Sequence, residues 1–131
     1  RPKSSAASDV YKRQGHLPLG EALMNQQLVA GVGNVYKSEI LFMNRLNPFE
    51  PLSNFDDVTL RLCLRSARHY MRRNLEGLRR KFRGSTLGDR LWVYRRQGMS
   101  CLECSGPIAM QRQGETARST YYCPVCQGTG R

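Results

Sequence analysis

Hydrophobic positions recur at helical spacing through the first two thirds of the chain. Between residues 19 and 30 one stripe follows the three- and four-residue period of a helix: Leu19, Ala22, Leu23, Leu28 and Ala30. Gly31-Val32-Gly33 then interrupts the helix, because two glycines permit backbone angles that other residues avoid. We expect Asn34 to cap a second helix that runs to about Asn44. Its inward positions are Val35, Ile40, Leu41 and Met43.

A third helix is predicted from about Asp56, with Ser53 or Asn54 as its cap and acidic residues at the positive end of its dipole. It is the longest periodic element, with inward positions Leu60, Cys63, Leu64, Ala67, Tyr70, Met71, Leu75 and Leu78. Cys63 lies on this stripe, so we interpret it as an ordinary buried thiol. Residues 91–94 (LWVY) indicate a short strand that leads into the cysteine-rich region.

Charge is concentrated in one part of the chain. The 131 residues carry 21 basic and 10 acidic side chains, a formal net charge of +11. Residues 61–96 hold twelve basic residues against Glu76 and Asp89, a net charge of +10. This concentration favours a phosphate-facing surface over a merely solvated helical face. No apolar run reaches about 18 residues, so we expect no membrane span.

Two CxxC pairs dominate the last third of the chain, and 18 residues separate them. Their members are Cys101, Cys104, Cys123 and Cys126. One tight turn in each pair can aim two sulfurs at a single ion, which predicts a tetrahedral zinc site. Strands are expected at 108–112 and 119–122, with Gly114 near the turn. Four protein ligands leave no position for a catalytic water, so we predict one structural Zn²⁺. A redox CxxC, an iron–sulfur centre and two disulfides are the alternatives.

Three segments together carry a family resemblance: QQLVAGVGNVYKSEILF at 26–42, VYRRQGMSCLEC at 93–104 and ARSTYYCPVCQ at 117–127. Over about residues 15–128 the chain resembles the C-terminal half of the formamidopyrimidine-DNA glycosylase / endonuclease VIII family. The stretch 34–39 favours the endonuclease VIII side. The resemblance implies a mainly α fold, in which a helix–two-turn–helix bundle precedes a small four-cysteine zinc β-hairpin.

The implied division of the chain has three parts. Residues 1–14 are Ser/Ala-rich, basic and aperiodic, and we set them aside as an unstructured tail or an artefactual segment. Residues 15–90 would form the helix–two-turn–helix DNA-binding domain, and residues 91–131 the zinc finger.

The resemblance also implies a DNA-binding site. Asn34 matches the asparagine that contacts a DNA phosphate beside the lesion. Arg118 matches the arginine of the zinc hairpin that grips the phosphates around the flipped nucleotide and has a role in δ-elimination. With Gly33 and Lys37 they make up the expected DNA-binding set. The implied partner is double-stranded DNA with damaged bases or abasic sites, bound by a monomer inside a bacterial cell, in the cytoplasm or nucleoid.

The implied activity is that of a base-excision-repair DNA glycosylase and abasic-site lyase, which removes an oxidised base and then cleaves the strand. The family's nucleophile is an N-terminal proline followed by glutamate, supported by a lysine of a first domain. Here Pro2 is followed by Lys3, and that domain has no counterpart. We therefore expect these 131 residues to bind DNA without excising bases.

Two residues could be considered as substitute nucleophiles. Arg118 stays protonated, and Lys37 is expected to be solvated, with no apolar pocket to lower its pKa.

The functional alternatives are a non-catalytic zinc-ribbon module for nucleic acid, or a protein-interaction ribbon with incidental charge.

Overall fold

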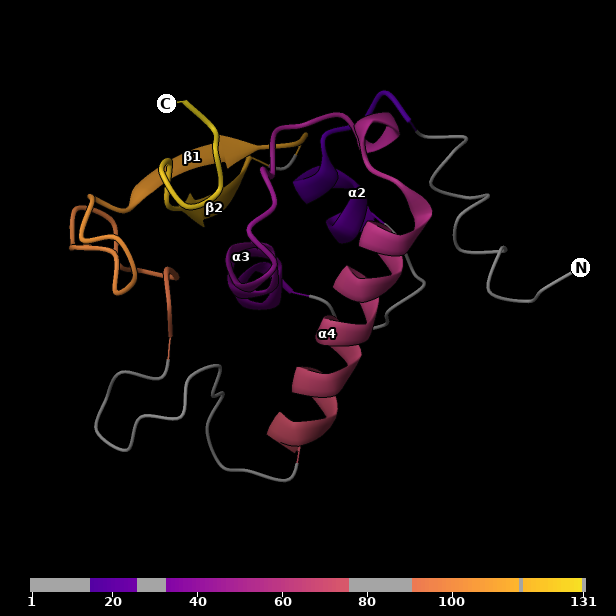
Figure 1. Ribbon diagram of the computed structural model, residues 1–131, viewed down its shortest axis with the longest axis horizontal. Helices are drawn as coiled ribbons and strands as arrows, with labels where there is room; N and C mark the ends of the chain where they lie inside the picture. Colours follow the sequence, from indigo (N-terminus) through magenta and orange to yellow (C-terminus); the bar gives the residue numbers. More distant parts are fainter. Residues whose placement is uncertain (1–14, 26–32, 76–90, 116, 131) are drawn as a thin grey trace, which may run out of the picture.

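The computed structural model describes residues 15–25, 33–75, 91–115 and 117–130. Three helices come first: α2 (Leu19–Asn25), α3 (Asn34–Met43) and α4 (Asp57–Leu75). A short 3₁₀ helix, η1 (Leu52–Asn54), precedes α4, and the hairpin β1 (Ala109–Gln113) and β2 (Arg118–Tyr122) ends the described fold. Figure 1 shows α3 between the hairpin and α4, with α2 beside it. This is the mainly α arrangement with a terminal hairpin that the sequence predicts.

The central position of α3 explains its burial. Residues 37–42 are all buried, because α2 and α4 cover one side of the helix while the hairpin covers another. One core cluster joins α2, α3 and α4 through residues such as Leu23, Ile40 and Leu64. A second cluster joins Phe42 to Val93 and the cysteine region. The helical bundle and the hairpin are therefore packed against each other through α3.

The long stripe of α4 behaves as predicted where it is described. Leu60, Cys63, Leu64 and Ala67 are buried in the core. Cys63 is 1% exposed, and burial raises the pKa of its thiol to about 12, so it is the inert core thiol that we expected. Arg61 and Arg65 lie on the exposed face of the helix. Residues 76–90, which carry much of the basic segment, lie outside the described residues, as do 1–14 and 26–32.

Both predicted helix caps are wrong. Asn34 is the first residue of α3, and Gly33 takes the cap position with extended backbone and no side-chain cap bond. For α4 the cap is Asp56, whose Oδ1 accepts a 2.8 Å hydrogen bond from the Thr59 backbone N–H. Ser53 and Asn54 belong instead to η1, one turn too early to reach the free N–H groups of α4.

The hairpin follows the prediction to within one residue at each strand. It is antiparallel, with Ala109 opposite Tyr122 and Gln113 opposite Arg118. Gly114 closes the turn at φ 81°, a left-handed conformation that suits glycine. Gln113 is buried and anchors the strand to the helical part: its Nε2 donates to the Pro48 carbonyl at 2.8 Å.

No helix of the described ranges is long and apolar enough to cross a membrane.

Candidate nucleic-acid interface and metal centre

Two hydrogen bonds place the first turns of α3 against β2. Asn34 Nδ2 donates to the Ser119 carbonyl at 2.6 Å, and one turn later the Tyr121 backbone N–H donates to Ser38 Oγ at 3.2 Å. Ser119 adjoins Arg118 in the sequence, so the N-terminal end of α3 and the start of β2 form one surface. Two of the predicted DNA-binding residues, Asn34 and Arg118, therefore come together from distant parts of the chain.

Hydrogen-bonding atoms at this end of α3 lack partners within the described residues. The Oδ1 atom of Asn34 is buried and has no hydrogen-bond partner within the described residues. Its Nδ2 group has two N–H donors, of which one is used by Ser119. Among the described residues, nothing lies within 4 Å of a methyl group added at Gly33, so they leave space beside the first backbone N–H groups of α3.

Lys37 is buried, contrary to the expectation from the sequence. Its side chain is 1% exposed, because α2 and the hairpin pack around this face of α3. Burial first, and then the positive charge of Arg118, lower the pKa of Lys37 to about 8, while Glu21 acts in the opposite direction. Lys37 thus carries a charge that has lost much of its hydration and is repelled by a neighbouring cation.

This combination suits an anion. The N-terminal end of α3 offers backbone N–H groups that have no partner within the helix, and the positive end of a helix dipole. Lys37 and the exposed Arg118 add two like charges at the same place, and Asn34 adds an amide donor. A phosphate group would relieve the repulsion between the two cations and accept hydrogen bonds from Arg118 and Asn34, while the buried Lys37 would act through its charge.

Glu39 is a buried structural residue that the sequence analysis missed. Its buried carboxylate accepts three backbone N–H bonds: from Trp92 at 2.5 Å, Val93 at 2.7 Å and Tyr94 at 2.9 Å. Burial raises the pKa of Glu39, and these three bonds oppose the rise. The strand predicted at 91–94 is therefore wrong, because its backbone donors bind a side chain instead of a neighbouring strand. The available signal was an acidic residue four positions after Val35, on the inward stripe.

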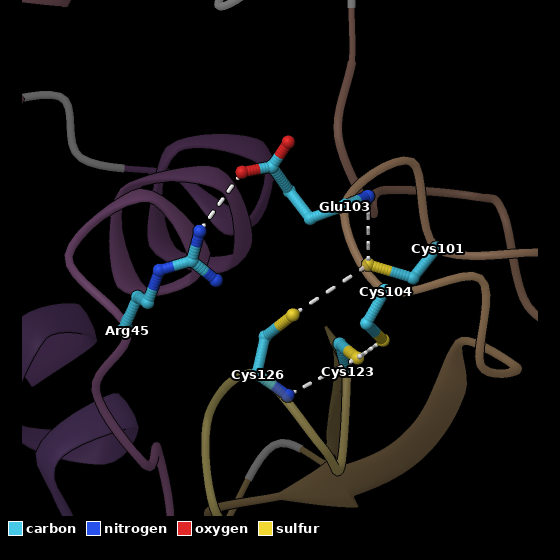
Figure 2. A network of polar contacts seen from close by, with 6 residues as sticks. All are labelled: Arg45, Cys101, Glu103, Cys104, Cys123 and Cys126. Carbon is cyan, nitrogen blue, oxygen red and sulfur yellow. Dashed lines mark hydrogen bonds and ion pairs between the residues drawn. The ribbon is translucent and has the colours of Figure 1, made fainter.

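The four predicted ligands converge on one point. The Sγ atoms of Cys101, Cys104, Cys123 and Cys126 all lie within 4.8 Å of one another. Cys101 and Cys126 Sγ are 3.8 Å apart, and Cys104 and Cys123 Sγ are 3.4 Å apart. A tetrahedron with metal–sulfur distances of about 2.3 Å requires sulfur separations of about 3.8 Å. The arrangement could therefore hold a metal ion, and Figure 2 shows the four side chains pointing toward one another.

The surrounding backbone favours thiolates. The N–H groups of Glu103, Gly106 and Cys126 each donate to a cysteine sulfur at 3.4 Å. Such N–H···S bonds stabilise negative charge on sulfur, which is the form that binds metal. Within the described residues the cysteines are all free thiols, so the disulfide alternative has no support in this geometry.

The sequence profile described as "Formamidopyrimidine-DNA glycosylase H2TH domain" matches residues 3–83. The chain belongs to this family of DNA glycosylases with a helix–two-turn–helix domain. It is 34% identical over 128 aligned residues to the formamidopyrimidine-DNA glycosylase of Thermus thermophilus, covering 86% of this chain and 45% of the relative. It is 42% identical over 122 residues to the DNA-(apurinic or apyrimidinic site) lyase Nei2 of Mycolicibacterium smegmatis, covering 92% and 47%.

Solved structures agree on the fold. The crystal structure of the MutM (Fpg) protein from Thermus thermophilus matches with a TM-score of 0.74 at 31% identity, covering 90% of this chain and 48% of that one. A complex of the LlFpg protein with THF-DNA and an inhibitor matches with a TM-score of 0.77 at 22% identity, over 95% and 48%. The chain thus spans about half the length of the relatives that it matches.

Proposed function

We propose that this chain is the DNA-binding C-terminal half of a base-excision-repair DNA glycosylase and abasic-site lyase. The observation that carries the proposal is the meeting of Asn34, Lys37 and Arg118 at the N-terminal end of α3, where two cations are held close enough to repel each other. A DNA phosphate would offset that repulsion. Removal of an oxidised base and cleavage at the abasic site are proposed for the whole protein. The relatives are about twice as long as this chain.

The names of the relatives support the choice of substrate. They include a formamidopyrimidine-DNA glycosylase and an abasic-site lyase, and one structural neighbour is a complex with DNA that contains an abasic site. We propose double-stranded DNA with damaged bases or abasic sites as the partner, bound by one copy of the chain inside a bacterial cell. The division into a helical domain at 15–90 and a zinc finger at 91–131 is part of the same proposal.

We propose that the four cysteines hold one Zn²⁺. Four cysteine sulfurs within 4.8 Å of one another suit this ion and leave no open position, so the ion would fold the finger without taking part in the chemistry. Its role would be to fix the hairpin that presents Arg118 beside α3.

Arginine replacement on the hairpin tests the proposal. Arg118→Ala should weaken binding to a fluorescein-labelled duplex with a tetrahydrofuran abasic analogue by about tenfold, the effect of losing one charge-assisted phosphate contact. Arg112→Ala is the matched control, because Arg112 is an exposed arginine of β1 whose guanidinium donates to the Ala117 carbonyl. Fluorescence anisotropy gives both dissociation constants. Equal affinities for the two variants would contradict the proposed site.

The non-catalytic zinc-ribbon module remains the second candidate, and the same assay distinguishes it. A repair half should prefer the abasic duplex to an undamaged duplex of the same sequence, since the family acts on a nucleotide displaced from the stack. A general module should bind both equally. A protein-interaction ribbon should bind neither.

A further inference from the structure

Arg45 has an unusual backbone for its residue type. It follows the C-terminal end of α3, directly after Asn44, and its φ is 57°. Helices commonly place glycine at such a left-handed position, because a side chain there crowds the backbone. An arginine at this point is therefore strained, and its side-chain contacts offset part of that strain.

Those contacts lead to the metal centre. The Arg45 guanidinium donates to Glu103 Oε1 at 2.9 Å, and Glu103 lies between the ligands Cys101 and Cys104 in the sequence. In Figure 2 the guanidinium faces the Glu103 carboxylate and the Cys126 side chain. The Cζ atom of Arg45 also lies 5.9 Å from the centre of the Phe42 ring, so the guanidinium packs on this ring.

The negative charge of a four-thiolate metal centre explains why these contacts matter. Four thiolates around one divalent ion carry a net charge of −2, and neighbouring donors and cations stabilise such an excess. A guanidinium stays charged at any ordinary pH and can donate to a thiolate without competing for the metal. Arg45 faces the Cys126 side chain of one cysteine pair and binds Glu103, which lies within the other pair in the sequence.

We propose that Arg45 is a positioning residue of the metal centre, which offsets the charge of the four thiolates and slows the loss of the metal ion. Because Arg45 extends from the end of α3 and Asn34 begins the same helix, it also ties the metal centre to the helix of the candidate DNA-binding site. The inference rests on the zinc site of the proposed function and is independent of DNA binding.

Arg45→Gly is the sharpest test, since glycine suits the backbone angle while the guanidinium is removed. The matched control is Arg95→Gly. Arg95 is also an exposed arginine at positive φ, 61°, and it lies 5.5 Å over the Tyr94 ring, but no contact joins it to a cysteine in the described structure. The measurement is the rate at which zinc-loaded protein transfers Zn²⁺ to excess 4-(2-pyridylazo)resorcinol. We expect about tenfold faster release from Arg45→Gly and less than about a twofold change from Arg95→Gly.

Two conservative variants guard against a folding defect. Arg45→Lys keeps the charge but loses the forked donor, and Glu103→Gln removes the ion pair but leaves the guanidinium in place. Arg45→Lys should release zinc about two- to fivefold faster. Glu103→Gln should change the rate by less than about twofold, because it removes an anchor of the guanidinium and a negative charge beside the thiolates at once. The fluorescence of Trp92 in the folded state should be unchanged in both. Trp92 is the only tryptophan and packs on Phe42, so it reports on disruption of this end of α3.

The outcomes separate the two proposals. Equal release rates from wild type, Arg45→Gly and Arg45→Lys would overturn the role of Arg45 while leaving the zinc site in place. A wild-type protein that binds no zinc would overturn both the zinc site and this inference. DNA binding is measured separately and bears on neither result.

Discussion

Replacing Lys37 with methionine should stabilise the folded chain below pH 8 while weakening DNA binding. The folded-state pKa of Lys37 is lowered from 10.5 to about 8, chiefly by burial and then by Arg118. At about 1.4 kcal/mol for each pH unit, this difference corresponds to about 3 kcal/mol of destabilisation by the charged form. Methionine fills a similar volume without the charge, so Lys37→Met should recover up to about 3 kcal/mol at pH 7.

The sign of the pH dependence follows from proton binding. Between pH 8 and 10.5 the unfolded chain keeps the lysine proton that the folded chain has released. Stability therefore rises with pH across this window, and the cost of Lys37 is present in full only below pH 8. The difference between wild type and Lys37→Met should be largest below pH 8 and close toward pH 10.5.

Urea unfolding followed by Trp92 fluorescence, from about pH 6.5 to about pH 10.5, measures this difference directly. Arg61→Met is the control, because it makes the same kind of replacement at an exposed cation of α4. Parallel stability curves for wild type and Lys37→Met would refute the argument that Lys37 is a poorly compensated buried charge. If stability rises as predicted but DNA affinity is unchanged, Lys37 has no role in phosphate binding.

Three further changes test individual contacts. Glu39→Gln should lower the free energy of unfolding by about 1 to 3 kcal/mol, because an NH₂ group would face backbone donors such as the Trp92 N–H. A change below about 0.5 kcal/mol would show that water satisfies those donors equally well. Cys101→Ser, or removal of zinc with a chelator, should unfold the hairpin while the circular dichroism of the helices persists, and retention of hairpin NMR signals would argue against a structural ion. Gly20→Ala should cost about 1 to 3 kcal/mol in urea, since its new Cβ would overlap Gln113 Oε1, and an unchanged midpoint would mean that Gln113 moves aside freely.

Local patterns predicted the elements whose environment is set by their own period. The stripe of Leu60, Cys63, Leu64 and Ala67 is buried as expected, because a three- and four-residue spacing defines one face of a helix wherever the chain goes. The cysteine pairs likewise specify their own geometry, since each pair fixes two sulfurs within one turn.

Contacts between distant segments could not be predicted from local sequence patterns. Lys37 is buried because α2 and the hairpin meet over it, and nothing near residue 37 in the sequence shows this packing. The donors at 92–94 bind Glu39 instead of a strand, which depends on where the chain returns after residue 90. Gly33 precedes α3 without a side-chain cap, and the amide of Asn34 donates to the distant Ser119 carbonyl.

Phosphate contacts at the junction of α3 and the hairpin are central to the proposed grip on DNA. The salt dependence of binding to an abasic-analogue duplex tests them most directly. If about four to six phosphates are contacted, the logarithm of the association constant should fall with the logarithm of salt concentration with a slope of about −4 to −5. Arg118→Ala should make that slope shallower by about one. Binding that is absent or independent of salt, or an unchanged slope for Arg118→Ala, would contradict the claim.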